Sequence, residues 1–365
     1  MTEEVTLEVG GAVYSGWTSV EISRAIGEVA GTFTLSVSEG WAATDGPRLE
    51  PRRIRPGASC RVLSNGEPAV TGYVEAYQPS FAPGAHQVTI AGASRPVDFA
   101  ACAALVPGGQ FKGYTLGAIA RALAAPFAVG VVAGEGAPIA DLQVTPGEKV
   151  AEVLGRAAAL QGLAIWDDAA GRLVIGRPGA GVLSAPLVQG ADLVSGSAAN
   201  DMADRFSHYL VRAQQPTFAA FGGEGLEASN AIEAEVRDGA VTRYRPLLFA
   251  GQASMDQAQA LTRVKWERAV RAGGSLSVTA TVKGWRRSDG RLWSLNDRAP
   301  VVSPWLDLDG RELCVAALRF QKGKGGTVTG LTLVPPEALT PEPPDPPEGA
   351  GAALSIIPIG ERSSP

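Results

Sequence analysis

The chain opens on two runs in which apolar and polar residues alternate. Phe33, Leu35 and Val37 alternate with threonine and serine, and Val20 and Ile22 show the same spacing. A period of two places alternate side chains on opposite faces of a strand, so the pattern predicts half-buried β-strands. Turn signals containing glycine separate further runs of this kind. We therefore expect six or seven short strands in the first 94 residues, arranged as a small barrel or sandwich.

The period changes to a helical one over residues 95–185. Two segments place apolar residues on one helical face, namely Leu116, Ile119, Ala120 and Leu123, and then Val150, Val153, Leu154 and Ala157. Thr145 stands three positions before Glu148, which is the spacing of a capping box, so we expect Thr145 to cap the second helix and Pro146 to be its first helical residue. A hairpin is expected near Ala170-Gly171. These features predict a small α/β domain after the first β region.

The β pattern returns over residues 186–338, with one strong helix inside it. We expect this helix over residues 255–272, with Ser254 and Gln257 as its capping box and Gly273-Gly274 as its end. The fold class expected is mainly β with α/β insertions, α+β overall. The two β regions on either side of the helical domain are candidates for structural duplicates.

The last segment, residues 339–365, is rich in proline and is expected to form a stiff, extended spacer. A short apolar patch follows the prolines. Its residues are the candidates for partner binding, as an added strand or a groove-bound peptide: Leu354, Ile356, Ile357 and Ile359. The alternative is a frayed chain end with no partner.

Composition limits the classes of function. The formal net charge of −5 argues against nucleic-acid binding as the main function. The three cysteines are far apart in the sequence, so neither a disulfide framework nor a zinc site is expected, and all three are expected to be buried thiols. The first residues show no secretory signal and no apolar stretch is long enough to span a membrane. Assembly in the cytoplasm is therefore expected.

Motifs that carry chemistry are few. The string "KGKGGT" lacks the spacing of a phosphate-binding loop, so a basic hairpin tip is expected there. The string "DLDGRE" lacks two ligand positions of a calcium loop, so a hairpin turn at Asp309-Gly310 is expected instead. His86 and His208 lie inside predicted strands, and Asp167-Asp168 lies at a hairpin as two solvated charges. We assign no catalytic, cofactor-binding or metal-binding residues.

Seven of the 23 aromatic residues are tryptophans. Large aromatic rings near strand ends serve either as core anchors or as interface anchors, and a place in the core is expected for each tryptophan, with an interface as the alternative.

Several segments together resemble a known family. They are "GWTSVEISRAIGEVAGTFTLSV", "RFSHYLVRAQ", "RYRPLLF", "TRVKWERAVRAGGS", "KGWRRSDGRLWSLNDRAPVVSPW" and "ELCVAALRFQKGKGGTVTGLTLVPPEAL". In this order and spacing, over residues 3–339, they are similar to the baseplate hub proteins of phage Mu and its relatives. That family is related in fold to the T-even phage hub and to the amino-terminal part of type VI secretion spike proteins.

The resemblance implies a homotrimer in the virion. Each subunit would contribute two similar tube-type β-barrels, residues 1–94 and 186–338, so that six barrels imitate sixfold symmetry. The ring would join a hexameric tail tube to a trimeric spike. The resemblance implies no catalytic residues, and it does not extend beyond Leu339.

Two alternatives stay open at this point. A tail-tip glycan hydrolase would use a pair of Asp or Glu side chains as acid and nucleophile. A tail-tube or spike subunit suits the chain less well, because a tube protein needs one barrel and a spike needs long repetitive β segments.

Overall fold

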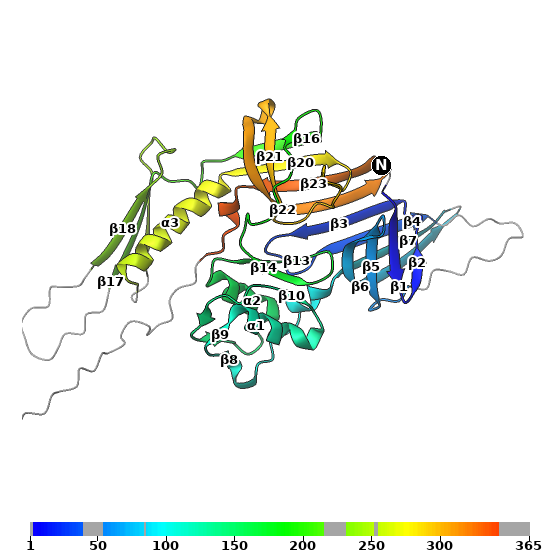
Figure 1. Cartoon of the computed structure of the whole chain (residues 1–365), viewed down its shortest axis with the longest axis horizontal. Helices are drawn as coiled ribbons and strands as arrows, with labels where there is room; N and C mark the ends of the chain where they lie inside the picture. Colours follow the sequence, from blue (N-terminus) through cyan, green and yellow to red (C-terminus); the bar gives the residue numbers. More distant parts are fainter. Residues whose placement is uncertain (1–2, 39–53, 84, 215–230, 252–254, 343–365) are drawn as a thin grey trace, which may run out of the picture. The chain divides into compact units, whose positions relative to one another are not determined.

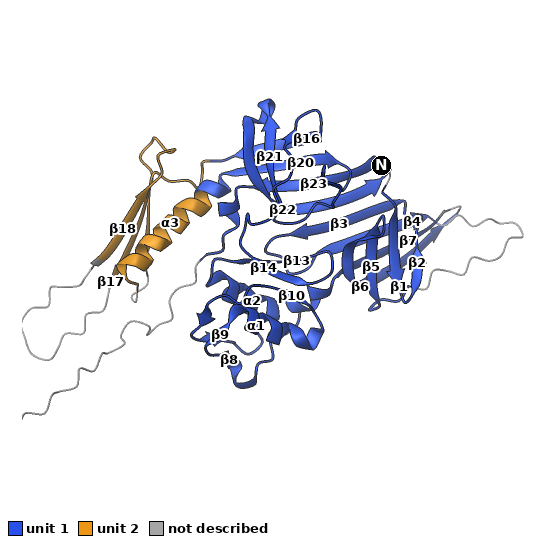
Figure 2. Ribbon diagram, viewed as in Figure 1, with its two compact units in different colours: residues 1–201, 272–342 blue, residues 202–271, 343–365 orange. Residues whose placement is uncertain are grey.

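In the computed structural model, the described residues are 3–38, 54–83, 85–214, 231–251 and 255–342. They are mainly β, which confirms the expected class. The chain divides into two compact units, residues 1–201 with 272–342, and residues 202–271 with 343–365, coloured separately in Figure 2. Each unit is described by itself below.

The first β region contains seven strands (Figure 1): β1 (Val5–Val9), β2 (Ala12–Tyr14), β3 (Ser19–Ala25), β4 (Thr32–Ser38), β5 (Ser59–Ser64), β6 (Glu67–Ala82) and β7 (Ala85–Ser94). The alternation read from the sequence is confirmed in β4, where Phe33, Leu35 and Val37 are buried and Thr32 and Thr34 are exposed. These strands pair in the order β3-β4-β7-β6-β5-β1-β2, and all the pairs are antiparallel.

The second β region contains six strands: β15 (Leu187–Val188), β16 (Leu193–Asn200), β20 (Leu276–Lys283), β21 (Arg298–Ser303), β22 (Leu308–Gly323) and β23 (Gly326–Val334). They pair in the order β16-β20-β23-β22-β21-β15. Strands β22 and β23 form a hairpin around Lys324, as expected for a basic hairpin tip.

The strand order of the second region repeats that of the first. Along the chain β15, β16, β20, β21, β22 and β23 correspond to β1, β3, β4, β5, β6 and β7, and corresponding strands have corresponding neighbours. Strands β6 and β22 both have 16 residues. Their ladders to β7 and β23 shift register at equivalent places, between Val74 and Ala76 and between Val315 and Ala317. One difference is that β15 pairs parallel with β21, whereas β1 pairs antiparallel with β5.

Both β regions belong to one sheet, because β3 pairs antiparallel with β22 from Ala25–Ala317 to Val20–Lys322. They also share one hydrophobic core, which includes Leu7 and Ile22 from the first region and Val278 and Leu331 from the second. Burying a leucine or isoleucine side chain stabilises a fold by about 1.5–3 kcal/mol, so this shared core favours folding of the two regions together.

The α/β domain lies within the larger unit and has its own core. Helices α1 (Leu116–Ala124) and α2 (Val150–Ala159) bury the predicted stripes against the sheet of β10 (Val131–Val132), β13 (Ala164–Asp167) and β14 (Leu173–Gly176). The predicted hairpin is confirmed, since β13 and β14 pair antiparallel. The remaining pairs are β8 (Gln110–Phe111) with β12 (Leu142–Gln143), and β9 (Tyr114–Thr115) with β11 (Pro138–Ile139). Short 3₁₀ turns are η1 (Arg95–Ala100), η2 (Pro107–Gly109) and η3 (Ala125–Phe127).

The predicted start of the second helix is wrong by four residues. Glu148 Oε2 does accept a hydrogen bond from the Thr145 amide, at 2.9 Å, as in a capping box. However, Gly147 has φ of +87°, a left-handed conformation that ends the turn and prevents a helix. Helix α2 instead begins at Val150, where the Glu152 carboxylate accepts from the Lys149 amide at 3.0 Å.

The smaller unit consists of β17 (His208–Gln214), β18 (Ala231–Arg237), β19 (Pro246–Ala250) and helix α3 (Gln257–Gly274), of which the residues up to Arg271 belong to it. Its sheet order is β18-β17-β19 and its core includes Tyr209, Val211 and Val264. It lies within the range 186–338 that we expected to form one barrel.

Helix α3 begins two residues later than predicted. The expected cap Ser254 lies outside the described residues. The observed capping box consists of Asp256 and Gln259, whose side chains each accept from the other's amide at 2.7 and 2.8 Å. Arg263 and Glu267, four positions apart on the helix, form an ion pair in which Nη2 and Oε2 are 3.6 Å apart.

The predicted hairpin turn at Asp309-Gly310 is wrong. The chain reverses earlier, through the 3₁₀ turn η4 (Pro304–Leu306) and Asp307, which has φ of +56°. Gly310 is instead the extra residue of a β-bulge in β22, with φ of +72°, between the pairs Val301–Arg311 and Val302–Asp309. A last 3₁₀ turn, η5 (Pro336–Leu339), ends the regular structure.

Candidate functional site

The amino-terminal segment is held by an ionic cluster around Glu3, which is 3% exposed. Its carboxylate accepts from Ser64 Oγ at 2.5 Å and from Asn65 Nδ2 at 2.7 Å. Arg286 Nε, from the second β region, lies 3.2 Å from Glu3 Oε1, and Lys322 Nζ donates to the Glu3 carbonyl at 2.7 Å. Charge-assisted hydrogen bonds of this kind are about twice as strong as neutral ones, so the cluster locks the two β regions together.

A second lock connects β3 to the α/β domain. Arg24 Nε lies 3.4 Å from Asp167 Oδ2, and the two side chains are 4% and 1% exposed. Arg24 also donates to the Ala69 carbonyl of β6. Burial raises the pKa of Asp167, although Arg24 and Ser94 beside it act in the opposite direction. The pair therefore holds three segments of the larger unit in register.

The Asp167-Asp168 dipeptide is not the pair of solvated charges that we expected. Asp167 is buried against Arg24, as described. Asp168 accepts from the amides of Ala170 and Arg172, both at 3.0 Å, and pairs with the Arg172 side chain at 2.6 Å. Asp168 thus stabilises the β13–β14 hairpin, whereas Asp167 connects β13 to β3.

The thiols differ in exposure. Burial raises the pKa of Cys60 to about 12 and that of Cys314 to about 11, so both stay protonated at neutral pH. Cys102 is exposed, so the expectation of three buried thiols is wrong at this position. Within the described residues, no group of three or more His, Cys, Asp or Glu side chains is placed to hold a metal ion.

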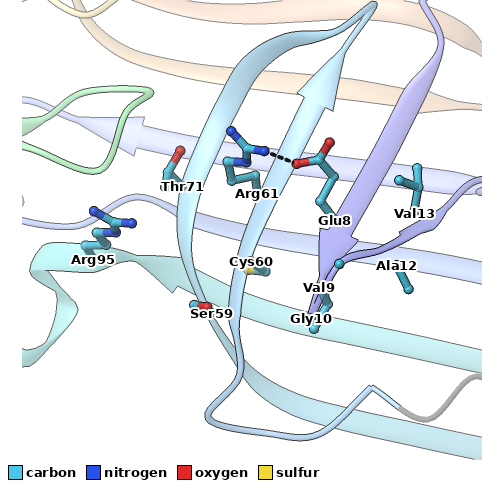
Figure 3. Close-up of a pocket in the computed structure, with 11 residues that line it drawn as sticks. Glu8, Val9, Gly10, Ala12, Val13, Ser59, Cys60, Arg61, Thr71 and Arg95 are labelled. Carbon is cyan, nitrogen blue, oxygen red and sulfur yellow. Dashed lines mark ion pairs between the residues drawn. The ribbon is translucent and has the colours of Figure 1, made fainter.

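A hollow of about 480 Å³ lies over β1, β2, β5 and β6 (Figure 3). Glu8 and Arg61 pair across it at 2.5 Å, and Thr71 and Arg95 lie on its far side. The two paired side chains are 28% and 58% exposed, so water screens them and their pairing stabilises the fold by about 0–1 kcal/mol. The hollow shows no combination of groups that predicts a reaction.

Two strand edges are open. Among the described residues, β20 is the only strand that pairs with β16, apart from an isolated bridge between Leu193 and Gln189, and Val194, Gly196 and Ser197 of β16 are exposed. The distal half of β6, from Gln78 to Ala82, pairs with β7 on one side, and no described strand pairs with its other side. Open edges present unpaired amide and carbonyl groups that can add a strand from another chain.

Phe81 and Trp305 are two strongly exposed aromatic side chains. Phe81, in the distal half of β6, is 86% exposed and stacks on His86. Trp305, in η4, is also 86% exposed, whereas Trp17, Trp166, Trp285 and Trp293 are buried. Trp305 therefore fits the interface alternative for tryptophans rather than the core one.

The apolar residues proposed for partner binding, Leu354, Ile356, Ile357 and Ile359, lie outside the described residues. The described chain ends at Glu342, shortly after η5. None of the described helices combines the length and apolar character needed to cross a bilayer.

Three family models match the chain. The "Mu phage baseplate assembly protein GpP-like, N-terminal" family matches residues 4–94, and the second domain of the "Baseplate hub protein gp44-like" family matches residues 97–177. The fourth domain of "Mu phage baseplate assembly protein GpP" matches residues 256–342. Most of the smaller compact unit lies between the second and third matches.

Whole-chain comparisons agree with these matches. The chain is 30% identical to the baseplate hub protein gp44 of Escherichia phage Mu over 348 residues, 93% of this chain and 89% of that protein. The 43 kDa tail protein of prophage MuSo2 from Shewanella oneidensis has 30% identity and a TM-score of 0.79, covering 92% of this chain and 99% of that one.

A more distant likeness concerns the fold alone. The c3393 protein of E. coli is described as a component of the type VI secretion system with structural similarity to the T4 tail proteins gp27 and gp5. It has a TM-score of 0.52 at 9% identity, covering 90% of this chain and 76% of that one. Together with the 30% identity across nearly the whole of gp44, the domain matches show that this chain belongs to the Mu-like phage baseplate hub proteins, structural components of the virion tail.

Proposed function

We propose that three copies of this chain close into a ring that adapts the sixfold tail tube to the threefold central spike. The observation that supports this proposal is the repeated strand order of the two β regions. Each chain then contributes two equivalent modules, residues 1–94 and 186–338, the second interrupted by the smaller unit. Three chains supply six modules, so a ring of threefold symmetry presents nearly sixfold features to the tube.

The ring acts through shape and buried surface, without a catalytic step. Obligate interfaces bury about 2,000 Å² or more, which keeps such a ring closed through assembly and firing. Its partners are the spike protein on one side and the tail tube or adjoining baseplate proteins on the other. We also propose that the ring is assembled in the host cytoplasm, without inserting into a membrane or binding a specific nucleic-acid sequence.

Native mass spectrometry of the purified full chain tests the ring. A mass of three chains, with a central opening in electron micrographs, is the expected result. A monomer at concentrations well above 10 µM contradicts the proposal, since an obligate interface of this size is far tighter than that.

The hydrolase alternative has a test of its own. No particular Asp or Glu pair was assigned to this chemistry, and Asp167 and Asp168 serve structural roles, so we expect the protein to leave peptidoglycan intact in a zymogram. Clearing by the full chain, and its loss on replacement of one carboxylate, would revive that alternative.

We further propose that the apolar patch formed by Leu354, Ile356, Ile357 and Ile359 binds a neighbouring baseplate or spike protein. The prolines before it favour an extended spacer that can present the patch at a distance. Deleting residues 343–365 should weaken spike binding. Replacing Ile356 and Ile357 with serine should weaken it equally, and replacing Ser363 and Ser364 with alanine is the matched control. Unchanged affinity in the deletion overturns this proposal.

A further inference from the structure

The pairing of β3 with β22 is a joint between two repeated modules. It uses the distal half of β22, beyond the bulge at Ala316, and the open edge of β3. At this joint Phe320 of β22 and Ile22 of β3 lie opposite each other and are 1% and 0% exposed. The joint therefore buries apolar side chains as well as pairing backbone groups.

The repeat predicts a second joint of the same kind. The equivalent of β22 is β6, and the equivalent of β3 is β16. The second joint would need the distal half of β6 and the outer edge of β16, and these are the two open edges described above. Position 79 of β6, the equivalent of the buried Phe320, is exposed. Within the described residues, the chain thus forms the joint between β3 and β22 and carries both surfaces of the equivalent joint between β16 and β6, which it does not form.

We propose that β16 of one copy pairs antiparallel with the distal half of β6 in the neighbouring copy. This inference rests on the proposed ring and names the surfaces that close it. The ring then contains three joints within chains, β3 with β22, and three equivalent joints between chains. Because the two surfaces differ, the contact is head-to-tail. In the proposed ring, three such contacts close the circle.

The repeat also specifies the register. Ser80 lies four residues beyond Ala76, as Gln321 lies four residues beyond Ala317, and both alanines directly follow the bulge. On the other edge, Ser197 pairs with Thr279 as Glu21 pairs with Thr34. The two threonines are equivalent, because they pair with Thr332 and Ala91, the residues opposite Ala317 and Ala76. Gln321 is opposite Glu21 in the joint that is made. The proposed joint therefore places Ser197 opposite Ser80 of the neighbouring copy.

The chemistry of the two edges suits this register. Neither edge carries a charged residue between Val194 and Asn200 or between Ala76 and Ala82, so no like charges meet. Phe81 of the neighbour falls opposite Gly196, which has no side chain. A Cβ at Gly196 would lie 3.5 Å from Leu306 Cδ1, so Phe81 is directed onto Leu306 beside the exposed Trp305. Aromatic side chains of this kind are the usual anchors of interfaces.

Pro79 makes the open edge of β6 a poor template for pairing with unrelated strands. Proline has no amide hydrogen and is one of the devices that protect edge strands. In the proposed joint β6 lies between two strands, so Pro79 cannot donate to the strand beside it, and the joint has one backbone hydrogen bond fewer there than the joint between β3 and β22.

Cysteine cross-linking tests the joint. In a full chain carrying Cys102→Ala, we combine Ser80→Cys with Ser197→Cys, since directly opposite residues of antiparallel strands lie within disulfide range. Mild oxidation is expected to give covalent trimers on a non-reducing gel. The off-register pair Ser80→Cys with Ser195→Cys is the control, with at least about tenfold less cross-link, and either single variant should give none.

The outcomes separate the two proposals. A trimer by mass that gives no Ser80–Ser197 cross-link, or as much from the off-register pair, overturns the joint and leaves the ring standing. A monomer by mass overturns the ring and the joint together. A cross-link within one chain overturns the joint as well.

A second measurement uses side-chain chemistry alone. Phe81→Asp should raise the concentration of half-assembly by about tenfold or more, because it places a charge against Leu306 and Trp305. Leu105→Asp is the matched control, since Leu105 is 90% exposed in the α/β domain, away from both edges. Equal assembly of the two variants overturns the joint.

Discussion

Arg24 and Asp167 form a buried ion pair, with Nε and Oδ2 3.4 Å apart, between the first β region and the α/β domain. Removing one charge from such a pair leaves the other buried and uncompensated. Arg24→Met should therefore lower the free energy of unfolding by about 3–5 kcal/mol, measured by urea denaturation.

The double variant distinguishes pairing from simple packing. Arg24→Met combined with Asp167→Leu should cost less than the sum of the single changes, because no charge stays buried. Arg61→Met is the control, since its pair with Glu8 is largely exposed and is expected to cost about 0–1 kcal/mol. Strict additivity of the two single effects would show that the pair is not coupled.

The cluster around Glu3 gives a second prediction. Glu3→Ala removes the carboxylate that Ser64, Asn65 and Arg286 contact, and should cost about 2–3 kcal/mol of unfolding free energy. Glu4 is its natural control, because the Glu4 side chain is exposed and only its backbone takes part, the amide donating to Asn65 Oδ1 and the carbonyl accepting from the Asn65 amide. Glu4→Ala should change stability by less than about 0.5 kcal/mol. Similar losses in the two variants would contradict a specific role for the Glu3 carboxylate.

The pH dependence of stability should reveal Asp297. Burial raises the pKa of this aspartate to about 6, despite Arg287 at 2.9 Å. Between the unfolded pKa of about 4 and the folded pKa, the folded chain binds more protons than the unfolded one. The contribution of Asp297 to stability therefore falls as the pH rises from about 4 to 6, and Asp297→Asn should remove this part of the pH dependence.

Asp289 contributes to the pH dependence of stability in the opposite direction. A hydrogen bond from the Arg291 amide lowers the pKa of Asp289, so its contribution is lost as the pH falls. Urea denaturation of the wild type and of Asp297→Asn at several pH values measures the difference. A wild-type protein whose stability rises between pH 4 and 6 by as much as that of Asp297→Asn would refute the assignment.

Thiol labelling should separate the three cysteines. Cys102 is exposed and should react with a maleimide within minutes in the native protein. Cys60 and Cys314 are buried and protonated, so they should react only when urea unfolds the chain. Mass spectrometry of the labelled native protein should show one adduct, and none in Cys102→Ala. More than one native adduct would contradict the burial of the other two.

The local features of this fold could be read from the sequence because they depend on neighbours in the chain. Alternation located β3 and β4, and the helical stripes located α1 and α2. Helix ends were less predictable. Thr145 and Glu148 do form the hydrogen bond of a capping box, but Gly147 has a left-handed conformation, so they close an isolated turn and no helix follows.

The site residues show the same limit. Sequence reasoning found neither the burial of Asp167 nor the exposure of Trp305, because both depend on segments that are distant along the chain. The repeat of strand order carries no detectable letter repeat, since a strand needs only an apolar face and tolerates many residues there.

The sequence by itself therefore determined the β-rich class, most of the strands and helices, and the resemblance to the phage hub family, because periodicity and turn chemistry act over a few residues. Only the tertiary structure decided that β3 pairs with β22, that Arg24 meets Asp167, and that the corresponding edges of β16 and β6 have no strand beside them among the described residues. Such contacts join segments up to about 300 residues apart, and which edges meet depends on the packing of the whole core rather than on any local preference.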